Sequence, residues 1–482
     1  MSTTATVSHL APSEPLAWPA AWKACALLGI VGAALLSLVS APAWVEGVGL
    51  LLAAFPVSIV LLRQPQWAFA TWLTVTASLN VLVSQASIDV GFKLYAVDAI
   101  FLLASLAALL ERGHQGDQAP IFTPRLLLVM CILVAFGLAQ TVRGVLAGNA
   151  FSDALGTLRR MFFYPVLAFA LARVFLRSPR GPHLVQRALW IASGIIGLVF
   201  AGRVITGIGY RSDIFAADRD VIRYLSYAEG LTLASGACLA LALWALNPSH
   251  PRRSRWLATA TLLSMLVIAS NYRSAWLALL AGLLCTGVAL SFRTPGGAFR
   301  AMVIGGVTAA TGIAALFVTP LGQLLVEKFS RLNLMTTGSW RLFSWVRAWE
   351  VFREHPLLGV GLGYHHVFAH FAGDFKTIVY ATNNSIHNDG LWVLVNTGVI
   401  GFGLFAILAL STVRQGLAFV KRAASIQSVA LACATIGGLG ACAVTAMLQP
   451  TLSLGGTSAW IGTAVALFTQ PTQVEYPHDR SS

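Results

Sequence analysis

Charged residues are scarce in this chain. Only 10% of its 482 residues are Asp, Glu, Lys or Arg, whereas 57% are hydrophobic. A soluble globular domain carries about 25% charged residues. The composition therefore excludes a solvated globular fold and predicts an integral membrane protein with little room for a separate soluble domain.

Cysteine is also sparse, and no pair of cysteines stands in a loop at the spacing of metal ligands. We therefore expect neither disulfide bonds nor a zinc site. Residues 1–22 lack the basic start of a signal peptide, so no cleaved signal is expected. The six cysteines, all within apolar runs, are Cys25, Cys131, Cys238, Cys285, Cys433 and Cys442.

Long apolar runs are abundant. About 20 apolar residues cross a bilayer, and within its hydrocarbon only helices satisfy their own backbone groups. The sequence therefore predicts an all-α integral membrane protein with 12–14 transmembrane helices. The candidate runs are 24–40, 47–62, 67–84, 95–111, 125–142, 161–177, 188–207, 225–246, 256–270, 272–291, 301–321, 389–412, 423–448 and 454–469.

The formal net charge is +14. In a membrane protein such an excess indicates either cytoplasmic loops, which are rich in Lys and Arg, or sites for an anionic lipid or phosphate. With a cytoplasmic N-terminus and alternating loops, the positive charge lies mainly on the cytoplasmic side once residues 322–388 are set aside, because long loops translocate regardless of charge. Both termini are then cytoplasmic, residues 322–388 face outward, and no nucleic acid partner is expected.

This topology divides the chain into five parts, and no internal repeat is visible. Residues 322–388 form the one insertion large enough to act as a functional cap. The parts are a cytoplasmic tail (1–22), an N-terminal transmembrane bundle (23–321), an outer catalytic loop (322–388), the C-terminal transmembrane helices (389–469) and a cytoplasmic tail (470–482).

The outer loop contains a predicted amphipathic helix. Ser339 can cap its start, and Pro356 ends it. Such a helix with tryptophans on its apolar side is typical of a membrane interface; a sugar-stacking or lipid-guiding role is an equal alternative. The apolar side holds Phe343, Trp345, Trp349 and Phe352, and the polar side holds Arg347, Glu350, Arg353 and Glu354.

Three glycines follow this helix, at positions 359, 361 and 363. The pattern lacks the strand and helix that flank a dinucleotide-binding motif. We interpret it as a flexible turn that brings the following loop back over the bundle.

His387 and Asn388 precede Asp389 at the point where the chain re-enters the membrane. A neutral imidazole can accept a proton from a hydroxyl group near pH 7, and the two neighbours can orient it or bind a sugar. The chemistry of His365, His366 and His370 is equivalent, and spacing alone does not choose among the four. None of them stands in a zinc motif of the HExxH kind.

Several arginines fall near the predicted outer ends of helices, where positive charge is disfavoured. The planar guanidinium matches phosphate oxygens, so a diphosphate ligand explains them; ion pairs with nearby acids are the alternative for residues 211–223. Arg273 interrupts an apolar stretch, where an unpaired charge is costly, and a functional role is favoured. The outer arginines are Arg143, Arg159, Arg160, Arg211, Arg219, Arg223, Arg273 and Arg341.

Acidic residues within apolar runs are candidates for counter-ions or proton-handling groups. They are Glu46, Asp98 and Glu229, and spacing does not assign a role to any of them. No divalent metal site for a diphosphate is expected in the outward loops.

These residues resemble the O-antigen ligase and O-antigen polymerase superfamily of bacterial membrane glycosyltransferases. The resemblance lies in YRSAWLALLAG at 272–282, GSWRLFSWVRAWEVFREHPLLGVGLGYHHVF at 338–368 and HNDGLWVLVNTGVIGFGLF at 387–405. It covers about an eighth of the chain, and the motifs do not distinguish one member from another.

The resemblance implies a bundle similar to the GT-C glycosyltransferases, in the bacterial inner membrane, with its active site facing the periplasm. It implies a glycan donor on undecaprenyl diphosphate, a second glycan or lipid A–core as the acceptor, and no cofactor or metal. Membrane lipids and a chain-length regulator are the further partners. The implied catalytic residues are His387 and Asn388, and the implied diphosphate-binding residues are Arg273, Arg341, Arg159 and Arg160, supported by Asp389, Arg223 and Glu229.

One position departs from the family pattern, because Asn396 stands where relatives often have an acid. The sequence does not decide between a ligase and a polymerase, although it slightly favours a polymerase. A lipid-linked oligosaccharide flippase is the alternative from another class, although paired halves and helices broken at the midplane, typical of transporters, are not apparent. A non-catalytic scaffold of an export complex is the remaining alternative.

Overall fold

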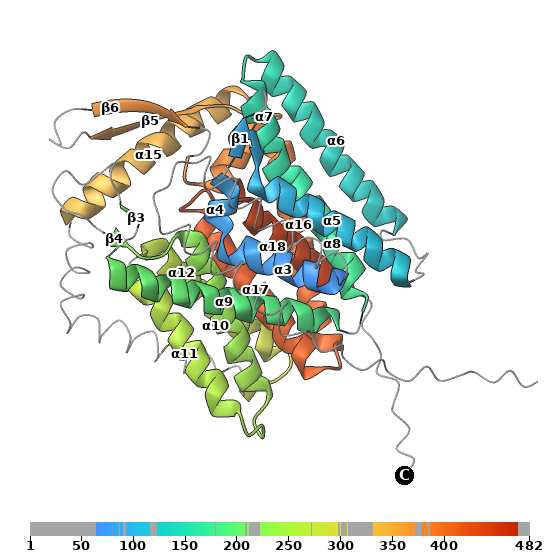
Figure 1. Ribbon diagram of the computed structural model, residues 1–482. Coiled ribbons are helices and arrows are strands. Elements are labelled where there is room, and N and C mark those ends of the chain that lie inside the picture. The colour runs from blue at the N-terminus through green and yellow to red at the C-terminus, as the bar shows by residue number, and fades with distance from the viewer. Residues whose placement is uncertain are drawn as a thin grey trace, which may run out of the picture. The chain divides into compact units, whose positions relative to one another are not determined.

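The computed structural model describes residues 64–85, 87–89, 93–115, 123–178, 180–207, 210–211, 222–270, 272–296, 299, 306, 331–371, 378–383 and 386–470. Its helices (Figure 1) are α3 (Pro65–Ser78), α4 (Asn80–Gln85), α5 (Ala96–Gln115), α6 (Pro124–Leu146), α7 (Phe151–Leu158), the π-helix η1 (Arg159–Phe163), α8 (Tyr164–Leu176), α9 (Gly181–Thr206), α10 (Tyr227–Leu246), α11 (Arg253–Ala269), α12 (Arg273–Ser291), α15 (Arg331–Glu354), α16 (Asp389–Arg422), α17 (Ile426–Ala446), the 3-10 helix η2 (Thr451–Ser453) and α18 (Gly455–Phe468). Three antiparallel hairpins pair β1 (Ser87–Asp89) with β2 (Lys93–Tyr95), β3 (Tyr210–Arg211) with β4 (Ile222–Arg223), and β5 (His366–Phe371) with β6 (Ile378–Asn383). All of these elements belong to one unit that begins at Gln64.

Seven helical segments of the described residues are long and apolar enough to cross a membrane: α6, the run from Phe151 to Leu176, α9, α10, α12, α16 and α17. Their surfaces expose large apolar side chains, such as Leu198, which is 76% exposed, and Leu410, which is 71% exposed. Apolar surface of this extent is typical of contact with lipid rather than water. The protein is therefore an all-α multi-pass membrane protein, which confirms the predicted fold class.

The predicted apolar runs correspond closely to the observed helices. Every run that falls on described residues is helical, including 256–270 and 272–291, which form the separate helices α11 and α12. The runs 24–40 and 47–62, and 301–321 apart from residue 306, lie outside the described residues. The total of 12–14 transmembrane helices therefore stays a prediction.

Small residues allow the central helices to approach closely. α17 packs against α10 and α12, and α18 packs against α8. A Cβ atom added at Gly437 would meet the backbone of Gly282 at 2.7 Å, and one at Gly462 would meet that of Pro165 at 2.5 Å. Contacts between small residues are the usual basis of helix association in membranes, because lipid supplies no hydrophobic driving force between helices.

α16 is interrupted at Gly398, whose φ of 66° and ψ of −171° are not helical. The break leaves two amides without partners in the helix. The amide of Val399 donates to the carbonyl of Pro356 at 2.9 Å, and that of Ile400 donates to Leu357 at 3.3 Å. Because lipid offers no hydrogen bonds, the chain just after α15 completes the broken helix.

The glycine segment, residues 359–363, continues from this contact and is packed between helices. Its three glycines have φ of 67°, 90° and 85°. Its amides donate to Val395 and Asn396 of α16 and to Gln140 of α6, at 2.9 to 3.1 Å. The predicted turn is present, but its predicted flexibility is wrong, because backbone groups of two helices hold the segment from both sides.

α15 begins at Arg331, so Ser339 lies inside the helix and the predicted start there is wrong. The predicted end before Pro356 is confirmed. The helix buries Ser344, Ala348 and Phe352 and exposes an apolar strip of Leu342, Val346 and Trp349. The charged residues Arg347 and Glu350 pair at 2.7 Å beside this strip. Its role at an interface or on a sugar stays a prediction.

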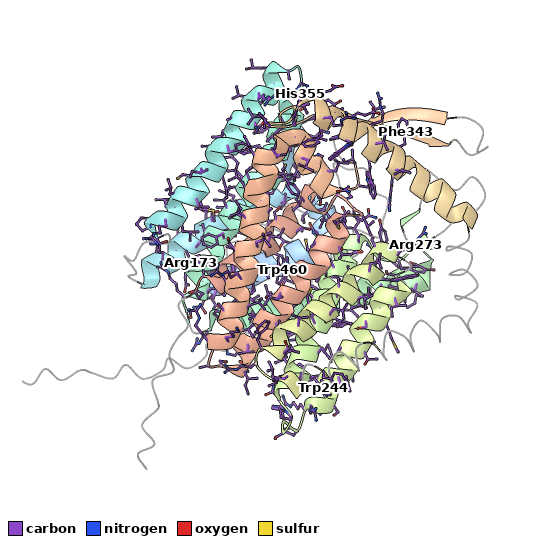
Figure 2. All side chains as sticks on the ribbon, turned by 180° about the vertical axis from the view of Figure 1, so that it is seen from behind. Arg173, Trp244, Arg273, Phe343, His355 and Trp460 are labelled. Carbon is purple, nitrogen blue, oxygen red and sulfur yellow. The ribbon has the colours of Figure 1, made fainter. Side chains whose placement is uncertain are left out.

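The loops that the alternating topology predicts on one side meet at one end of the bundle, which we call the site end. There Asn149 donates to the carbonyl of Leu362 at 3.0 Å, and the amide of Gly455 donates to Ser84 at 3.2 Å. At the opposite end Gln186 donates to the carbonyl of Gln427 at 2.9 Å. Figure 2 shows His355 and Phe343 near the top of the view, at the site end, and Trp244 near the bottom, at the opposite end.

Candidate functional site

His387 lies in the connection between β6 and α16. Its φ of 51° makes it the one non-glycine residue with positive φ in the described ranges. A side chain bearing a Cβ is strained in this conformation, and such strain is concentrated at functional sites. Asn388 follows as the N-cap of α16, where its Oδ1 accepts from the amide of Leu391 at 3.0 Å. The cap fixes the start of α16, and His387 lies directly before it.

The His387 imidazole faces Gln449, with Nδ1 3.2 Å from Oε1 of the amide. When the proton of the neutral ring is on Nδ1, this nitrogen donates to Gln449, and Nε2 carries the basic lone pair. Burial and the positive charge of Arg341 lower the pKa of His387 to about 4. The imidazole is therefore neutral at physiological pH.

Arg341 is positioned by the α15 turn that follows it. Trp345, one turn further along the same helix face, donates its indole N–H to the carbonyl of Ile386 at 3.1 Å. Ile386 is buried and directly precedes His387. The structure therefore brings Arg341 and His387 together, as the resemblance implies.

A hydrophobic cluster packs where α15 meets the residues before α16. It joins Ala348 and Phe352 of α15 to Ile386 and to Trp392 and Val393 of α16, and it extends to α7 and η1. Each of these five side chains is at most 8% exposed. The site is therefore built on packed side chains, although it stands in a connection.

Asp389 ties the start of α16 to the turn between α17 and α18. Its carboxylate is 3% exposed and accepts from the amide of Leu452 at 2.8 Å. We call residues 449–454 the polar turn. It carries Gln449 at one end and Leu452 near its middle, so it contacts both His387 and Asp389.

Two tyrosines connect the start of α12 to the polar turn. Tyr227 donates its hydroxyl to the carbonyl of Pro450 at 3.2 Å, and its ring lies 6.1 Å from that of Tyr272. Tyr272 is the N-cap residue of α12, which begins at Arg273. The start of α12, which carries Arg273, therefore lies near the polar turn.

The two adjacent arginines of η1 have different surroundings. Arg160 donates to the carbonyl of Ser453 in the polar turn at 3.4 Å. Arg159 instead forms an ion pair with Asp98 at 2.8 Å and donates to the carbonyl of Lys93 at 2.6 Å. Arg160 therefore joins the polar turn, whereas the charge of Arg159 is already balanced.

The predicted supporting residues differ from one another. Glu229 forms a capping box with Ser226 at the start of α10 and pairs with Arg203 at 3.2 Å, which accounts for its burial. Arg223 belongs to β4, but its side chain lies outside the described residues, as does that of Arg211. Arg219 and Glu46 also lie outside them.

Two of the competing histidines have other surroundings. His365 pairs with Asp153 of α7 at 2.9 Å. His366 is 2% exposed, and burial lowers its pKa to about 3. The side chain of His370 lies outside the described residues. Of the three histidines whose side chains the structure describes, His387 is the one that Gln449 and Arg341 accompany.

Asn396 lies inside the first part of α16, fully buried, and its amide donates to the carbonyl of Trp392 at 2.8 Å. Its Oδ1 has no hydrogen-bond partner among the described residues. A carboxylate here would be buried without a counter-charge, which is costly. The surroundings thus accommodate an amide at this position.

The polar turn was missed from the sequence. Gln449, Tyr227 and Ser453 were not singled out, although Gln449 and Pro450 interrupt two long apolar runs. A glutamine at a helix boundary carries no specific signal, and only the fold brings it to His387. Within the described ranges no group of three His, Cys, Asp or Glu side chains is arranged to hold a metal ion.

Fold and site define a multi-pass helical membrane protein with a half-buried neutral imidazole and arginines at one end of its bundle. Residues 258–406 match the family described as O-antigen ligase. The match confirms the resemblance to the O-antigen ligase and polymerase superfamily over that segment, which contains Arg273, Arg341 and His387. Arg160 and the polar turn lie outside it. A search of curated proteins found no match.

Proposed function

We propose that the protein is a metal-independent, inverting glycosyltransferase. It moves a glycan from undecaprenyl diphosphate to a hydroxyl acceptor at the periplasmic face of the bacterial inner membrane. The reaction serves polysaccharide polymerisation, as in O-antigen or exopolysaccharide synthesis, or ligation of O-antigen to lipid A–core. The observation that carries this proposal is the neutral His387 imidazole, held by Gln449 and faced by the charge of Arg341, within the segment that matches the O-antigen ligase family.

His387 acts as the general base in this scheme. Nε2 accepts the proton of the acceptor hydroxyl while the hydroxyl oxygen attacks the anomeric carbon from the face opposite the diphosphate. The bond between the anomeric carbon and the diphosphate oxygen breaks, and the electron pair leaves with the lipid-linked diphosphate. General base catalysis of this kind contributes about 10²–10⁴-fold.

The arginines stabilise the leaving group. Arg341 of α15 acts on His387, Arg160 of η1 donates to the polar turn, and Arg273 begins α12 next to Tyr272. Fixed positive charge aimed at a developing diphosphate is the electrostatic contribution that usually dominates group transfer. Arg159 is omitted, because Asp98 already balances its charge. Asn388 and Asp389 hold the start of α16 and so position His387.

The test uses purified full-length protein with an undecaprenyl-diphosphate-linked repeat unit, with or without lipid A–core. A ladder of products without added core identifies a polymerase, and a single mobility shift that requires core identifies a ligase. His387→Ala is expected to abolish transfer and to leave the protein folded in detergent. His183→Ala, at an exposed histidine of α9, is the matched control. Near-normal transfer by His387→Ala would contradict the proposal.

A further inference from the structure

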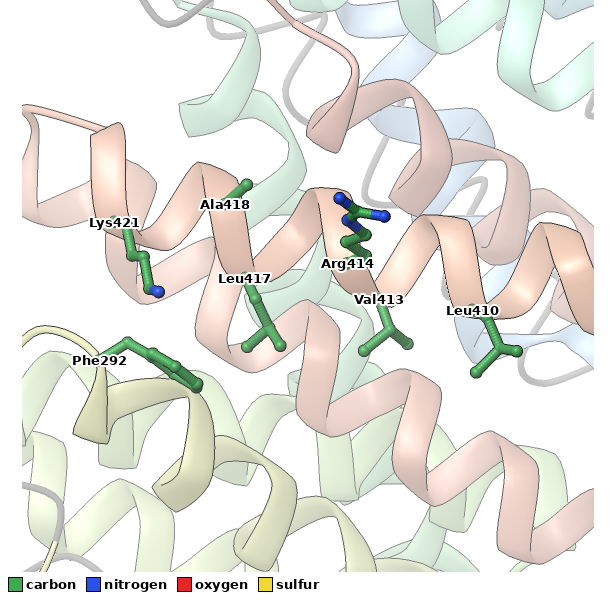
Figure 3. Close-up of a pocket in the computed structure, with 7 residues that line it drawn as sticks. All are labelled: Phe292, Leu410, Val413, Arg414, Leu417, Ala418 and Lys421. Carbon is green, nitrogen blue, oxygen red and sulfur yellow. The ribbon is translucent and has the colours of Figure 1, made fainter.

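A groove opens on the surface between the C-terminal parts of α12 and α16, at the end opposite the site (Figure 3). It has a volume of about 440 Å³. Phe292, the C-cap residue of α12, forms one wall, and Leu410, Val413 and Leu417 of α16 form the other. Figure 3 shows the three α16 side chains on one side of their helix, towards Phe292.

The groove continues an exposed apolar strip of α12. Leu284 is 50% exposed, Val288 is 53% exposed and Phe292 is 43% exposed, each one helical turn after the last. On α16 the wall runs from Leu410 to Lys421, a length of about 16 Å at 1.5 Å per residue. One leaflet of the hydrocarbon core is about 15 Å deep. The groove therefore matches an acyl chain in depth and in polarity.

The mouth of the groove is cationic. The Lys421 ammonium lies 4.6 Å from the centre of the Phe292 ring. Arg293 donates to the carbonyls of Lys421 and Ala423 at 2.8 and 3.1 Å, which fastens α12 to the end of α16. Because these acceptors are uncharged, they leave the positive charge of Arg293 unbalanced.

Two further arginines add to this charge. Arg414 lines the groove two turns before Lys421, and Arg422 donates to the carbonyl of Ala418 at 3.2 Å. Among the described residues no Asp or Glu forms an ion pair with any cation at the groove. Lys421, Arg293 and Arg422 thus bring positive charge to the end of the apolar groove, whereas the Arg414 guanidinium points away from the three apolar side chains (Figure 3).

We propose that this groove binds an acidic phospholipid of the leaflet at the end opposite the site. One acyl chain lies along Leu410, Val413 and Leu417, and the phosphate group lies beside Lys421 and Arg293. Guanidinium and ammonium groups form strong charge-assisted hydrogen bonds with phosphate. A zwitterionic lipid brings no net negative charge to the mouth, so the groove selects for an anionic headgroup.

Native mass spectrometry of the purified full-length protein tests the headgroup preference. Phosphatidylglycerol and phosphatidylethanolamine with identical acyl chains are titrated separately. Phosphatidylglycerol is expected to bind more tightly, and Lys421→Gln is expected to weaken its binding about fivefold. Arg255→Gln, at an exposed arginine of α11 near the same end, is the matched control and is expected to change nothing. Equal binding of the two lipids would overturn the proposal.

A second variant tests the groove itself. Val413→Trp fills the groove and is expected to abolish the tight phosphatidylglycerol adduct, whereas Leu262→Trp, at a 58% exposed position of α11, is expected to keep it. Full binding by Val413→Trp would overturn the proposal. So would efficient disulfide cross-linking of Val413→Cys to a cysteine introduced within residues 301–321, since the chain itself would then fill the groove.

Discussion

The indole of Trp345 donates a hydrogen bond to the carbonyl of Ile386, 3.1 Å away, and so joins α15 to the residue before His387. Arg341 stands one turn earlier on the same face of α15. The bond therefore sets the position of a positive charge relative to the imidazole. A cation that lowers the pKa of His387 keeps the base unprotonated while it also attracts an anionic substrate.

The pH dependence of transfer follows from this relationship. Neutral His387 is the active form, and its pKa is lowered from 6.5 to about 4. We therefore expect kcat/KM, which reports the free enzyme, to be lost as the pH falls through about 4 rather than through 6.5. Arg341→Gln removes the positive charge, raises the pKa of His387 and moves the acid limb of the kcat/KM profile to higher pH. Arg341→Lys keeps the charge and is the control; a limb that stays in place in Arg341→Gln would contradict the assignment.

Gln449 is expected to act through His387. Gln449→Leu removes the acceptor for Nδ1–H, so the ring loses its fixed orientation, and kcat/KM is expected to fall about ten- to a hundredfold. Gln449→Glu keeps an acceptor and adds a negative charge, which raises the pKa of His387 and moves the acid limb to higher pH. Steady-state rates across pH measure both effects. Gln427→Leu, at an exposed glutamine of the opposite end, is the control, and wild-type rates in Gln449→Leu would refute the role.

Asn388 is expected to act as a helix cap. Asn388→Ala removes the acceptor for the amide of Leu391 and should cost about 1 kcal/mol of unfolding free energy, together with part of the activity. Asn388→Ser and Asn388→Asp restore a capping oxygen and should recover both. Thermal unfolding in detergent and transfer rates are measured in parallel. Recovery of stability without activity in the serine variant would instead assign Asn388 a direct contact with substrate.

Gly361 is expected to tolerate no side chain. Its φ of 90° is unfavourable for other residues, and an added Cβ would collide with the backbone of Gly144 in α6. Gly361→Ala should therefore lower the free energy of unfolding by about 3 kcal/mol. Gly403→Ala, in the second part of α16 with no atom near its added Cβ, should leave stability unchanged or raise it slightly. Equal unfolding midpoints for the two variants would contradict the packed state of the glycine segment.

The helices could be predicted from the sequence because lipid leaves the backbone no other way to satisfy its polar groups. The position of His387 before α16 and the end of α15 before Pro356 could also be predicted, because both follow from short patterns in the local sequence. The start of α15 could not be predicted, because Ser339 is a good cap residue that the helix passes through. Local preference is overridden there by the continuation of the helix from Arg331.

The other features of the site could not be predicted, because they depend on contacts between segments that are far apart in the sequence. The sequence places Arg159 and Arg160 side by side, yet Asp98 pairs with one and Ser453 accepts from the other. Gln449 meets His387 across 62 positions of the chain. No local pattern reports either pairing, since both depend on how α5, α8, α17 and α18 pack.

The break at Gly398 also bears on how the protein is assembled. The amides of Val399 and Ile400 find their acceptors at Pro356 and Leu357, which belong to the preceding outer segment. During biogenesis, α16 therefore cannot reach its final state as an independently inserted span. Its insertion is completed only once the preceding loop has folded back onto it, so the maturation of the loop and that of the membrane bundle are a single event.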